Sequence, residues 1–307
     1  MNVETTPRLS VVIACYNSSE TLGDQLEALA NQPCPVPWEL IVADNGSTDG
    51  SAALARSFAG RLPLRVVDAS TRRGPAHARN VGVDAAHGAW IAFCDADDVV
   101  APDWLARVCA AMSRHAFVAG RVDVQLLNPP SLWLSRAMEQ QEGLQPASGN
   151  RLGLPHAGAG NMAIHREVFR RVGGFDEGLR CLEDTDLCWR VQLAGTPLVF
   201  DRDLLLHTRL RSTLRGNFAQ GRSYARGQSG LERRYGPLTP GTCARAGQHS
   251  DSRSAKLAAA FRGVFESHNV RGLAWRLGWY VERAHAVEVG NVGLGVTEPP
   301  YTTEQFT

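Results

Sequence analysis

Runs of apolar residues separated by amphipathic stretches organise the first third of the chain. Four short runs are dominated by apolar and β-branched side chains: residues 9–14, 38–43, 64–67 and 90–94. Burial without alternation is typical of parallel strands, because helices cover both faces of the sheet. Leu22, Leu26 and Leu29 have helical spacing, and Asn17 with Glu20 predicts a capping box before that helix. The pattern predicts an α/β fold with a doubly wound, mostly parallel central sheet flanked by helices.

The later part of the chain is less regular. A further strand is predicted near residues 118–124 and a helix near 166–172. Residues 236–254 are rich in Gly, Pro, Ser and Thr and are interpreted as a linker. Beyond it, Trp275 and Trp279 lie four positions apart and indicate an amphipathic helix. A small C-terminal helical extension is therefore expected.

The composition excludes several classes of function. Formal net charge is +1, so nothing points to nucleic acid as a partner, and no motif indicates an oligomeric state. Lys256 is the single lysine and lies in no motif suited to Schiff-base or phosphate-loop chemistry. The connection after the first strand, residues 14–19, has neither a G-x-G-x-x-G turn nor a Walker loop. Dinucleotide-binding and P-loop functions are thereby disfavoured.

The cysteines and the hydropathy pattern bear on the compartment. Seven cysteines show no C-x-x-C pair and no zinc spacing, which fits a reducing environment. We find no signal peptide and no apolar run approaching about 18 residues. A cytoplasmic protein is expected.

A group of carboxylates follows the apolar run at residues 90–94. Asp95, Asp97 and Asp98 stand at the predicted carboxyl end of that strand, the edge where open α/β sheets bind ligands. Neighbouring carboxylates are unfavourable unless a cation neutralises them, and a divalent ion that prefers oxygen ligands is suitable. Taken alone, the motif is equally compatible with a solvated acidic turn.

Further motifs follow one another in a defined order. They read ACYN, VADNGSTDGS, RGPAHARNVG, FCDADD, GAGNMAIHREVFRRVGGFDE and LEDTDLCWR, with a later histidine, His207. In this order they resemble a family 2 glycosyltransferase of the GT-A fold, over roughly residues 9–235. The resemblance implies metal-dependent, inverting transfer of a sugar from a nucleoside-diphosphate sugar to an acceptor hydroxyl. It assigns donor binding to residues 1–125, acceptor binding and catalysis to 126–235, and a linker, amphipathic helices and tail to 236–307.

The resemblance also assigns roles on the donor side. Asp97 matches the metal-binding aspartate of the D-x-D motif, and Asp95 matches the aspartate near the ribose. Tyr16 would lie against the base, and Asp44 would accept a hydrogen bond from an imide N–H. Arg79 would reach the nucleotide, with an ordinary surface arginine as the alternative. The expected cofactors are Mn²⁺ or Mg²⁺ and a UDP- or dTDP-sugar in preference to a GDP-sugar.

On the acceptor side the resemblance identifies Asp184 as the catalytic base, while Asp186 is expected to be structural. Glu183 would orient the acceptor or cap a helix. His207 matches a position where the family often has a metal-binding histidine, and imidazole suits manganese, although a lone histidine is more often not a ligand. Residues 158–161 form either a segment whose backbone approaches the ligand or an ordinary loop.

The region after His207 departs from the processive members of that family. The Q-x-x-R-W motif of polymer synthases is absent, which predicts transfer of one sugar or very few. Arg209, Arg211 and Arg215 stand there instead. They could bind a diphosphate or phosphorylated acceptor, seat the protein peripherally on an anionic membrane at its inner face, or form a solvated basic surface.

The sequence leaves two rival functions open. Residues 95–99 also fit the D-x-D-x-[TV] motif of haloacid-dehalogenase-like phosphatases, but here the motif follows the fourth strand rather than the first. Alternatively, the chain binds a sugar nucleotide without turnover.

Overall fold

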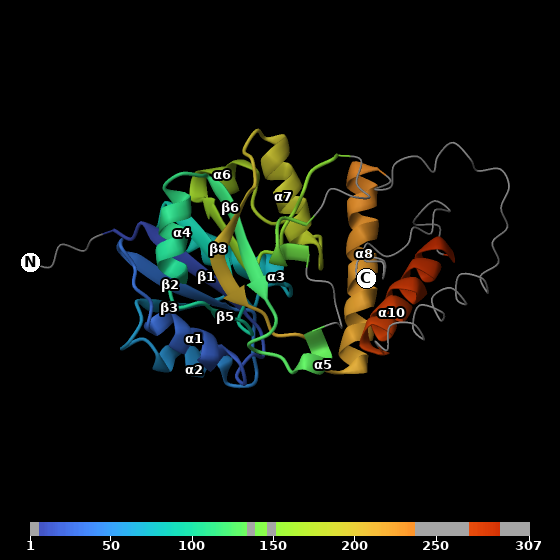
Figure 1. Ribbon diagram of the computed structural model, residues 1–307, viewed down its shortest axis with the longest axis horizontal. Helices are drawn as coiled ribbons and strands as arrows, with labels where there is room; N and C mark the ends of the chain where they lie inside the picture. The colour runs from blue at the N-terminus through green and yellow to red at the C-terminus, as the bar shows by residue number, and fades with distance from the viewer. Residues whose placement is uncertain (1–5, 134–138, 146–151, 237–269, 289–307) are drawn as a thin grey trace, which may run out of the picture. The chain divides into compact units, whose positions relative to one another are not determined.

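The computed structural model describes residues 6–133, 139–145, 152–236 and 270–288 (Figure 1). The chain forms two compact units. The first unit is built from three stretches: residues 1–127, 138–146 and 154–209. The second unit is built from three others: residues 128–137, 147–153 and 210–307.

The first unit contains one eight-stranded sheet. Its strands are, in chain order, β1 Leu9–Cys15, β2 Trp38–Asp44, β3 Leu64–Asp68, β4 Trp90–Cys94, β5 Val99–Val100, β6 Phe117–Asp123, β7 Asn161–His165 and β8 Val199–His207. Their spatial order is β3-β2-β1-β4-β7-β6-β8-β5. Strands β1 to β4 are parallel, so their carboxyl ends meet at one edge. β7 is antiparallel to β4 and β6, and β5 is antiparallel to β8, so the expected α/β sheet is mixed in its second half.

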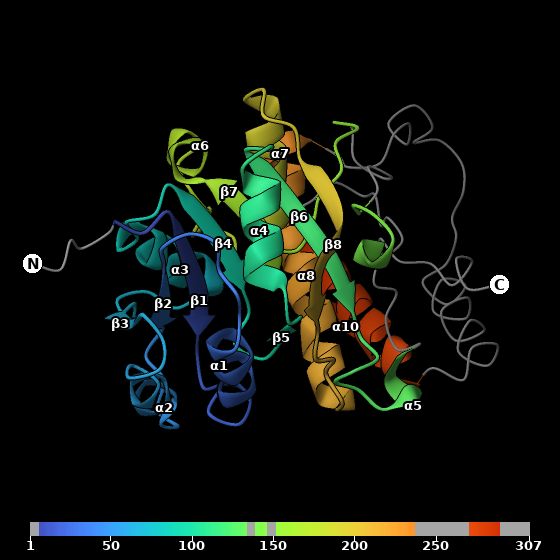
Figure 2. The same ribbon diagram turned by 60° about the vertical axis from the view of Figure 1, so that its left-hand side comes forward.

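Helices cover both faces of this sheet (Figures 1 and 2). They are α1 Leu22–Ala30, α2 Ser51–Ser57, α3 Pro75–Asp84, α4 Trp104–Met112, α6 Arg166–Arg171 and α7 Glu183–Leu193, with a 3-10 turn at Glu139–Gln141. Along β1, Val11 and Ile13 pack with α1, α2 and α4, whereas Val12 packs with α3, α6 and α7. Successive side chains thus enter two different cores, which explains why the strand sequence does not alternate.

The capping box predicted at Asn17 and Glu20 is wrong. Helix α1 begins at Leu22, and Thr21 in the cap position makes no side-chain capping bond. Asn17 has a left-handed φ of 48°, and its side-chain oxygen accepts a hydrogen bond from the Thr48 N–H at 2.8 Å. The asparagine therefore joins the connection after β1 to the one after β2, a long-range contact that local spacing does not reveal.

The second unit contains α5 Pro130–Trp133, α8 Leu214–Tyr235 and α10 Val270–Glu288. Contacts advance in step along α8 and α10, from Arg271 with Ser212 to Arg283 with Glu232, so the two helices run parallel. Trp275 and Trp279 are buried, as the four-residue spacing predicted. Most of the predicted linker at 236–254 lies outside the described residues.

Glycines set the distance between α8 and α10. A Cβ added at Gly221 would collide with the backbone of Trp275, and one added at Gly278 would collide with the backbone of Phe218. Close approach of two helices at small residues is a general packing solution. Among the described residues, no helix is both long and apolar enough to cross a membrane.

Candidate functional site

Three connections meet at the carboxyl edge of β1, β2 and β4. Tyr16 follows β1, Asp44 ends β2, and the turn carrying Asp95 and Asp97 follows β4. Because the three strands are parallel neighbours, these side chains leave the sheet in the same direction.

The acidic turn after β4 brings three carboxylates together. Asp95, Asp97 and Asp98 each offer an oxygen, and these oxygens lie within 4.8 Å of one another. Buried Gln25 fixes the turn from α1, because its amide donates to the Asp95 carbonyl at 3.2 Å and accepts from the Val100 N–H at 3.0 Å. No local motif in the sequence marks this glutamine.

Asp98 is the buried member of the three. It accepts hydrogen bonds from the Arg209 N–H at 2.9 Å and from the Thr208 hydroxyl at 3.2 Å. Burial, followed by the charges of Asp95 and Asp97, raises the pKa of Asp98 well above its ordinary value. The arrangement favours uptake of positive charge, and a divalent cation bound by oxygen ligands would supply it.

Arg79 on α3 links this turn to a distant part of the chain. Its guanidinium lies 2.8 Å from Asp95 Oδ1 and 2.8 Å from Glu183 Oε1. The residue is only 6% exposed, which rules out the alternative of a surface arginine. The charges of Asp95 and Glu183 outweigh burial and raise the pKa of Arg79, so the cation is permanent.

Glu183 and Asp184 open α7 beside that arginine. Burial and the charge of Asp184 raise the pKa of Glu183 to about 7. Burial also raises the pKa of Asp184, although the Arg79 charge and backbone N–H groups oppose the shift. Asp184 accepts from the Thr185 N–H at 2.7 Å and from the Ala159 N–H at 3.4 Å. Asp186 is fully buried with Arg190 2.7 Å away, in keeping with a structural role.

The segment at residues 158–161 lies beside the carboxylates of Asp95 and Asp184. A Cβ added at Gly160 would lie 2.7 Å from Asp95 Oδ2, and one at Gly158 would lie 3.8 Å from Asp184 Oδ2. The backbone here lies close to the acidic side chains themselves, and its approach to a ligand stays a prediction. A larger residue at position 160 would push the Asp95 carboxylate aside.

Tyr16 and Asp44 lie at the carboxyl ends of β1 and β2. The Tyr16 side chain is 51% exposed, and the Arg73 guanidinium lies 4.4 Å from its ring centroid. Asp44 Oδ1 accepts from the Ser47 N–H at 3.2 Å. Asn45 holds Arg73 in place by accepting from its guanidinium through the backbone carbonyl at 2.8 Å. Sequence reasoning missed Arg73, which is separated from Tyr16 along the chain.

His207 ends β8 opposite Val99 of β5. Its Nδ1 lies 3.2 Å from Asp123 Oδ2, and its side chain is 15% exposed. In the part of the chain that the structure describes, the group of possible metal ligands contains the three aspartates and not His207. Its predicted role as a ligand stays a prediction.

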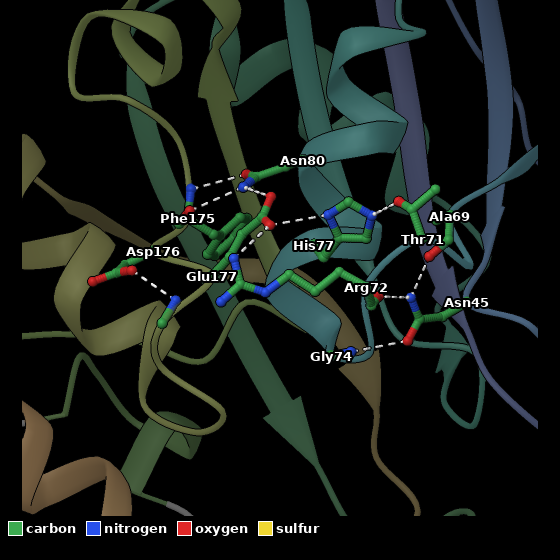
Figure 3. A network of polar contacts seen from close by, with 11 residues as sticks. Asn45, Ala69, Thr71, Arg72, Gly74, His77, Asn80, Phe175, Asp176 and Glu177 are labelled. Carbon is green, nitrogen blue, oxygen red and sulfur yellow. Dashed lines mark hydrogen bonds and ion pairs between the residues drawn. The ribbon is translucent and has the colours of Figure 1, made fainter.

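A second polar network connects α3 to the segment that precedes α7 (Figure 3). Glu177 lies 3.0 Å from His77 Nδ1, 3.0 Å from the Asn80 amide and 3.3 Å from Arg72. Asn80 also donates to the Phe175 carbonyl at 2.9 Å and accepts from its N–H at 2.9 Å. These bonds fasten the approach to Glu183 and Asp184 onto the helix that carries Arg79.

Comparison with known proteins places this geometry in a family. Residues 10–173, more than half of the chain, match the family described as glycosyl transferase family 2. A PGL/p-HBAD biosynthesis glycosyltransferase of Mycobacterium bovis is 31% identical over 194 residues, 60% of this chain and 73% of the relative. An uncharacterized glycosyltransferase of Haemophilus influenzae is 28% identical over 183 residues, 58% of this chain and 60% of the relative. The chain thus spans less than two thirds of that relative's length.

A solved structure shows the same fold. The mannosyltransferase PcManGT of Pyrobaculum calidifontis, in complex with GDP-Man and Mn²⁺, has a TM-score of 0.56 and 20% identity, covering 94% of this chain and 77% of its own. At this level of identity the likeness establishes the GT-A fold alone. Together with the family match it leads to one conclusion: the chain belongs to glycosyl transferase family 2.

Proposed function

We propose that the protein is a metal-dependent, inverting glycosyltransferase that moves one sugar from a nucleoside-diphosphate sugar to an acceptor hydroxyl. One observation carries the proposal. Arg79 joins Asp95, at the end of β4, to Glu183, at the start of α7. Carboxylates from distant parts of the chain therefore converge where an α/β sheet binds its ligand.

The donor half of the proposal depends on the acidic turn. Asp97, the exposed carboxylate, would hold the ion directly, with Asp95 nearer the ribose. When bound, a divalent ion neutralises the diphosphate as it departs. The raised pKa of Asp98 and the close spacing of the three carboxylates fit a site that accepts a cation. Asp123 at Nδ1 of His207 would leave Nε2 to face the ion, the arrangement commonly found around metal-binding histidines.

The nucleotide base would stack on Tyr16, whose exposed ring already receives a guanidinium on its face. Asp44, an acceptor at this edge, would take the imide N–H of uracil or thymine. We therefore propose a UDP- or dTDP-sugar. The structural relative PcManGT carries GDP-Man, so this base preference rests on Asp44 and Tyr16 and not on the likeness.

Asp184 would remove the proton from the acceptor hydroxyl. Its two oxygens are held by backbone N–H groups of Thr185 and Ala159, so the carboxylate is oriented before substrate arrives. The Arg79 charge opposes protonation of Asp184. Glu183 would orient the acceptor and not accept the proton, because its carboxylate is bound to Arg79.

The segment after β8 bears on the extent of transfer. Arg209 binds the Asp97 carbonyl at 3.1 Å and Asp24 at 3.0 Å, so it supports the acidic turn. We propose single transfer, because the processive motif is absent there. Arg211 and Arg215 keep their three alternatives, including contact with an anionic membrane, and a cytoplasmic location stays a prediction.

The test separates donor binding from turnover. Thermal unfolding is measured with UDP or dTDP, with and without Mn²⁺, and transfer is measured with the matching sugar nucleotide. Asp97→Ala should abolish the Mn²⁺-dependent rise in Tm. Asp184→Asn should keep that rise and lower kcat about 1,000-fold.

Asp203→Asn, at an exposed carboxylate, is the matched control and should change neither quantity. Near-normal transfer by Asp184→Asn would show that another group is the base. Donor binding by the wild-type protein without hydrolysis or transfer would favour the non-catalytic binder.

A further inference from the structure

Two cysteines far apart in sequence meet inside the first unit. Cys34 lies in the connection between α1 and β2, and Cys109 lies in α4. Their sulfur atoms are 3.9 Å apart across a sequence separation of 75 residues. We propose that Cys34 and Cys109 form a reversible disulfide, a modification site that reacts with low-molecular-weight disulfides such as glutathione disulfide.

The backbone around Cys34 presents its thiol to Cys109. Pro33 and Pro35 flank Cys34, and each proline fixes its own φ and restricts the residue before it. The two prolines therefore restrict the backbone of the connection at Cys34. A disulfide bond is about 2.05 Å long, so the sulfur atoms must approach by roughly 2 Å.

Existing hydrogen bonds already hold the two elements together. The Gln32 side chain donates to the Ala101 carbonyl at 2.7 Å and accepts from the Leu105 N–H at 3.1 Å. These bonds fasten the end of α1 to the start of α4, two residues from Cys34. These bonds keep the two elements together while the sulfur atoms close the remaining distance.

The two thiols differ in access and in acidity. Cys34 is half-buried, whereas Cys109 is only 5% exposed. Hydrogen bonds from the Cys109 thiol and the Val36 N–H outweigh burial and lower the pKa of Cys34 to about 7. The reagent therefore reaches Cys34 first, and the lowered pKa favours the thiolate that attacks it.

The reaction balances in two exchanges. The Cys34 thiolate attacks one sulfur of glutathione disulfide, forms a mixed disulfide and releases a glutathione thiolate. Cys109 then gives its proton to solvent base, its sulfur attacks Cys34 Sγ, and the second glutathione thiolate leaves. The protein loses two electrons and two protons, and glutathione disulfide becomes two glutathione thiols.

Other cysteines serve as a contrast. Cys15, Cys94 and Cys188 are buried, and burial raises the pKa of each thiol. They are poor nucleophiles toward external reagents for that reason. The hydrogen bond to Cys34 and burial raise the pKa of Cys109 as well, and Cys109 reacts in the second exchange because its sulfur lies beside that of Cys34. Cys181 is half-buried and provides a control of similar accessibility.

The test uses the full chain equilibrated in mixtures of reduced and oxidised glutathione, then blocked and digested without reduction. We expect one cross-linked peptide pair containing Cys34 and Cys109, and two fewer titratable thiols than in the reduced protein. Because the closed loop is long, the oxidised protein should unfold about 5 °C higher.

Cys34→Ser and Cys109→Ala should each abolish the cross-link and the rise in Tm, whereas Cys181→Ser should retain both. A stable mixed disulfide of glutathione on Cys34 with no cross-link in the wild-type protein would overturn the proposal. So would an unchanged thiol count over the whole series of mixtures, up to glutathione disulfide alone.

Discussion

Buried carboxylates at the amino ends of the parallel strands (the amino edge) and at their carboxyl ends (the carboxyl edge) have pKa values shifted in opposite directions. At the amino edge Glu39 is 6% exposed and accepts hydrogen bonds from the Ser10 hydroxyl at 2.7 Å, the His87 N–H at 2.7 Å and Arg65 at 2.7 Å. Burial by itself would raise the pKa of Glu39, but these donors hold it at about 2.

At the carboxyl edge Asp98 is buried to a similar degree, and its pKa is raised. Its nearest charges are those of Asp95 and Asp97, which are of the same sign. Burial raises the pKa of Asp98 and the like charges add to that shift, whereas at Glu39 the hydrogen-bond donors outweigh burial. A carboxylate supplied with donors stabilises the fold, whereas a cluster of like charges is typical of a functional site.

The largest effect is expected where one arginine compensates two carboxylates. Arg79→Met keeps the apolar stem and removes the cation from between Asp95 and Glu183. The free energy of unfolding, measured by urea denaturation in a chelator, should fall by about 3–5 kcal/mol. Adding Glu183→Gln to this variant should recover part of the loss, and a loss below about 1 kcal/mol would contradict the assigned role.

The contribution of Glu39 to the free energy of unfolding should depend on pH. Because the folded pKa of Glu39 is about 2, its ionised form stabilises the protein above the unfolded pKa, and this contribution disappears as pH falls through the folded value. Glu39→Gln should lower the free energy of unfolding by about 3 kcal/mol at pH 7, with the difference shrinking between roughly pH 5 and 2. A difference that does not change with pH would show that charge is not the cause.

At the carboxyl edge, replacing a carboxylate by an amide should raise the free energy of unfolding and not lower it. Asp98→Asn removes one of three crowded carboxylates and keeps the acceptor for the Arg209 N–H. In a chelator, the free energy of unfolding should rise by about 1 kcal/mol, while the rise in Tm caused by Mn²⁺ should diminish. Destabilisation in the chelator would mean that the two edges do not differ as described.

The smallest effect is expected from the network in Figure 3. Glu177→Gln keeps the shape of the side chain but weakens its contacts with His77 and Arg72. Since this network orients the segment before Asp184, kcat should fall about threefold to tenfold with Tm nearly unchanged. Glu167→Gln, at an exposed residue of α6, is the control; equal effects of both variants on kcat would exclude a positioning role for Glu177.

Strands with two buried faces were predictable, and irregular helices were not. Continuous apolar runs located β1, β2 and β4, since nothing but burial on both faces explains them. Helix α8 was missed because its sequence is rich in glycine and arginine, residues that do not form an apolar stripe. Its contact with α10 depends on small residues such as Gly221, so the signal is the absence of side chains.

The site, like the fold, was predictable in its local motifs and not in its long-range contacts. Local motifs identified the acidic turn. The resemblance pointed to Asp184, whose role as the base stays a prediction. The interactions that connect them are long-range: Arg79 spans 104 residues to Glu183, and buried Gln25 spans 70 to Asp95. A sequence pattern reports neighbours along the chain, and these contacts arise only when the sheet brings separate connections to one edge.

Leu182 shows how the backbone itself contributes to the site. This residue has a left-handed φ of 62° immediately before Glu183, a conformation that is unfavourable by roughly 1–2 kcal/mol for a side chain with a Cβ. A right-handed conformation at Leu182 would extend α7 by one residue towards its amino end. The left-handed backbone conformation of this one residue therefore sets the direction from which the chain reaches Glu183 and Asp184.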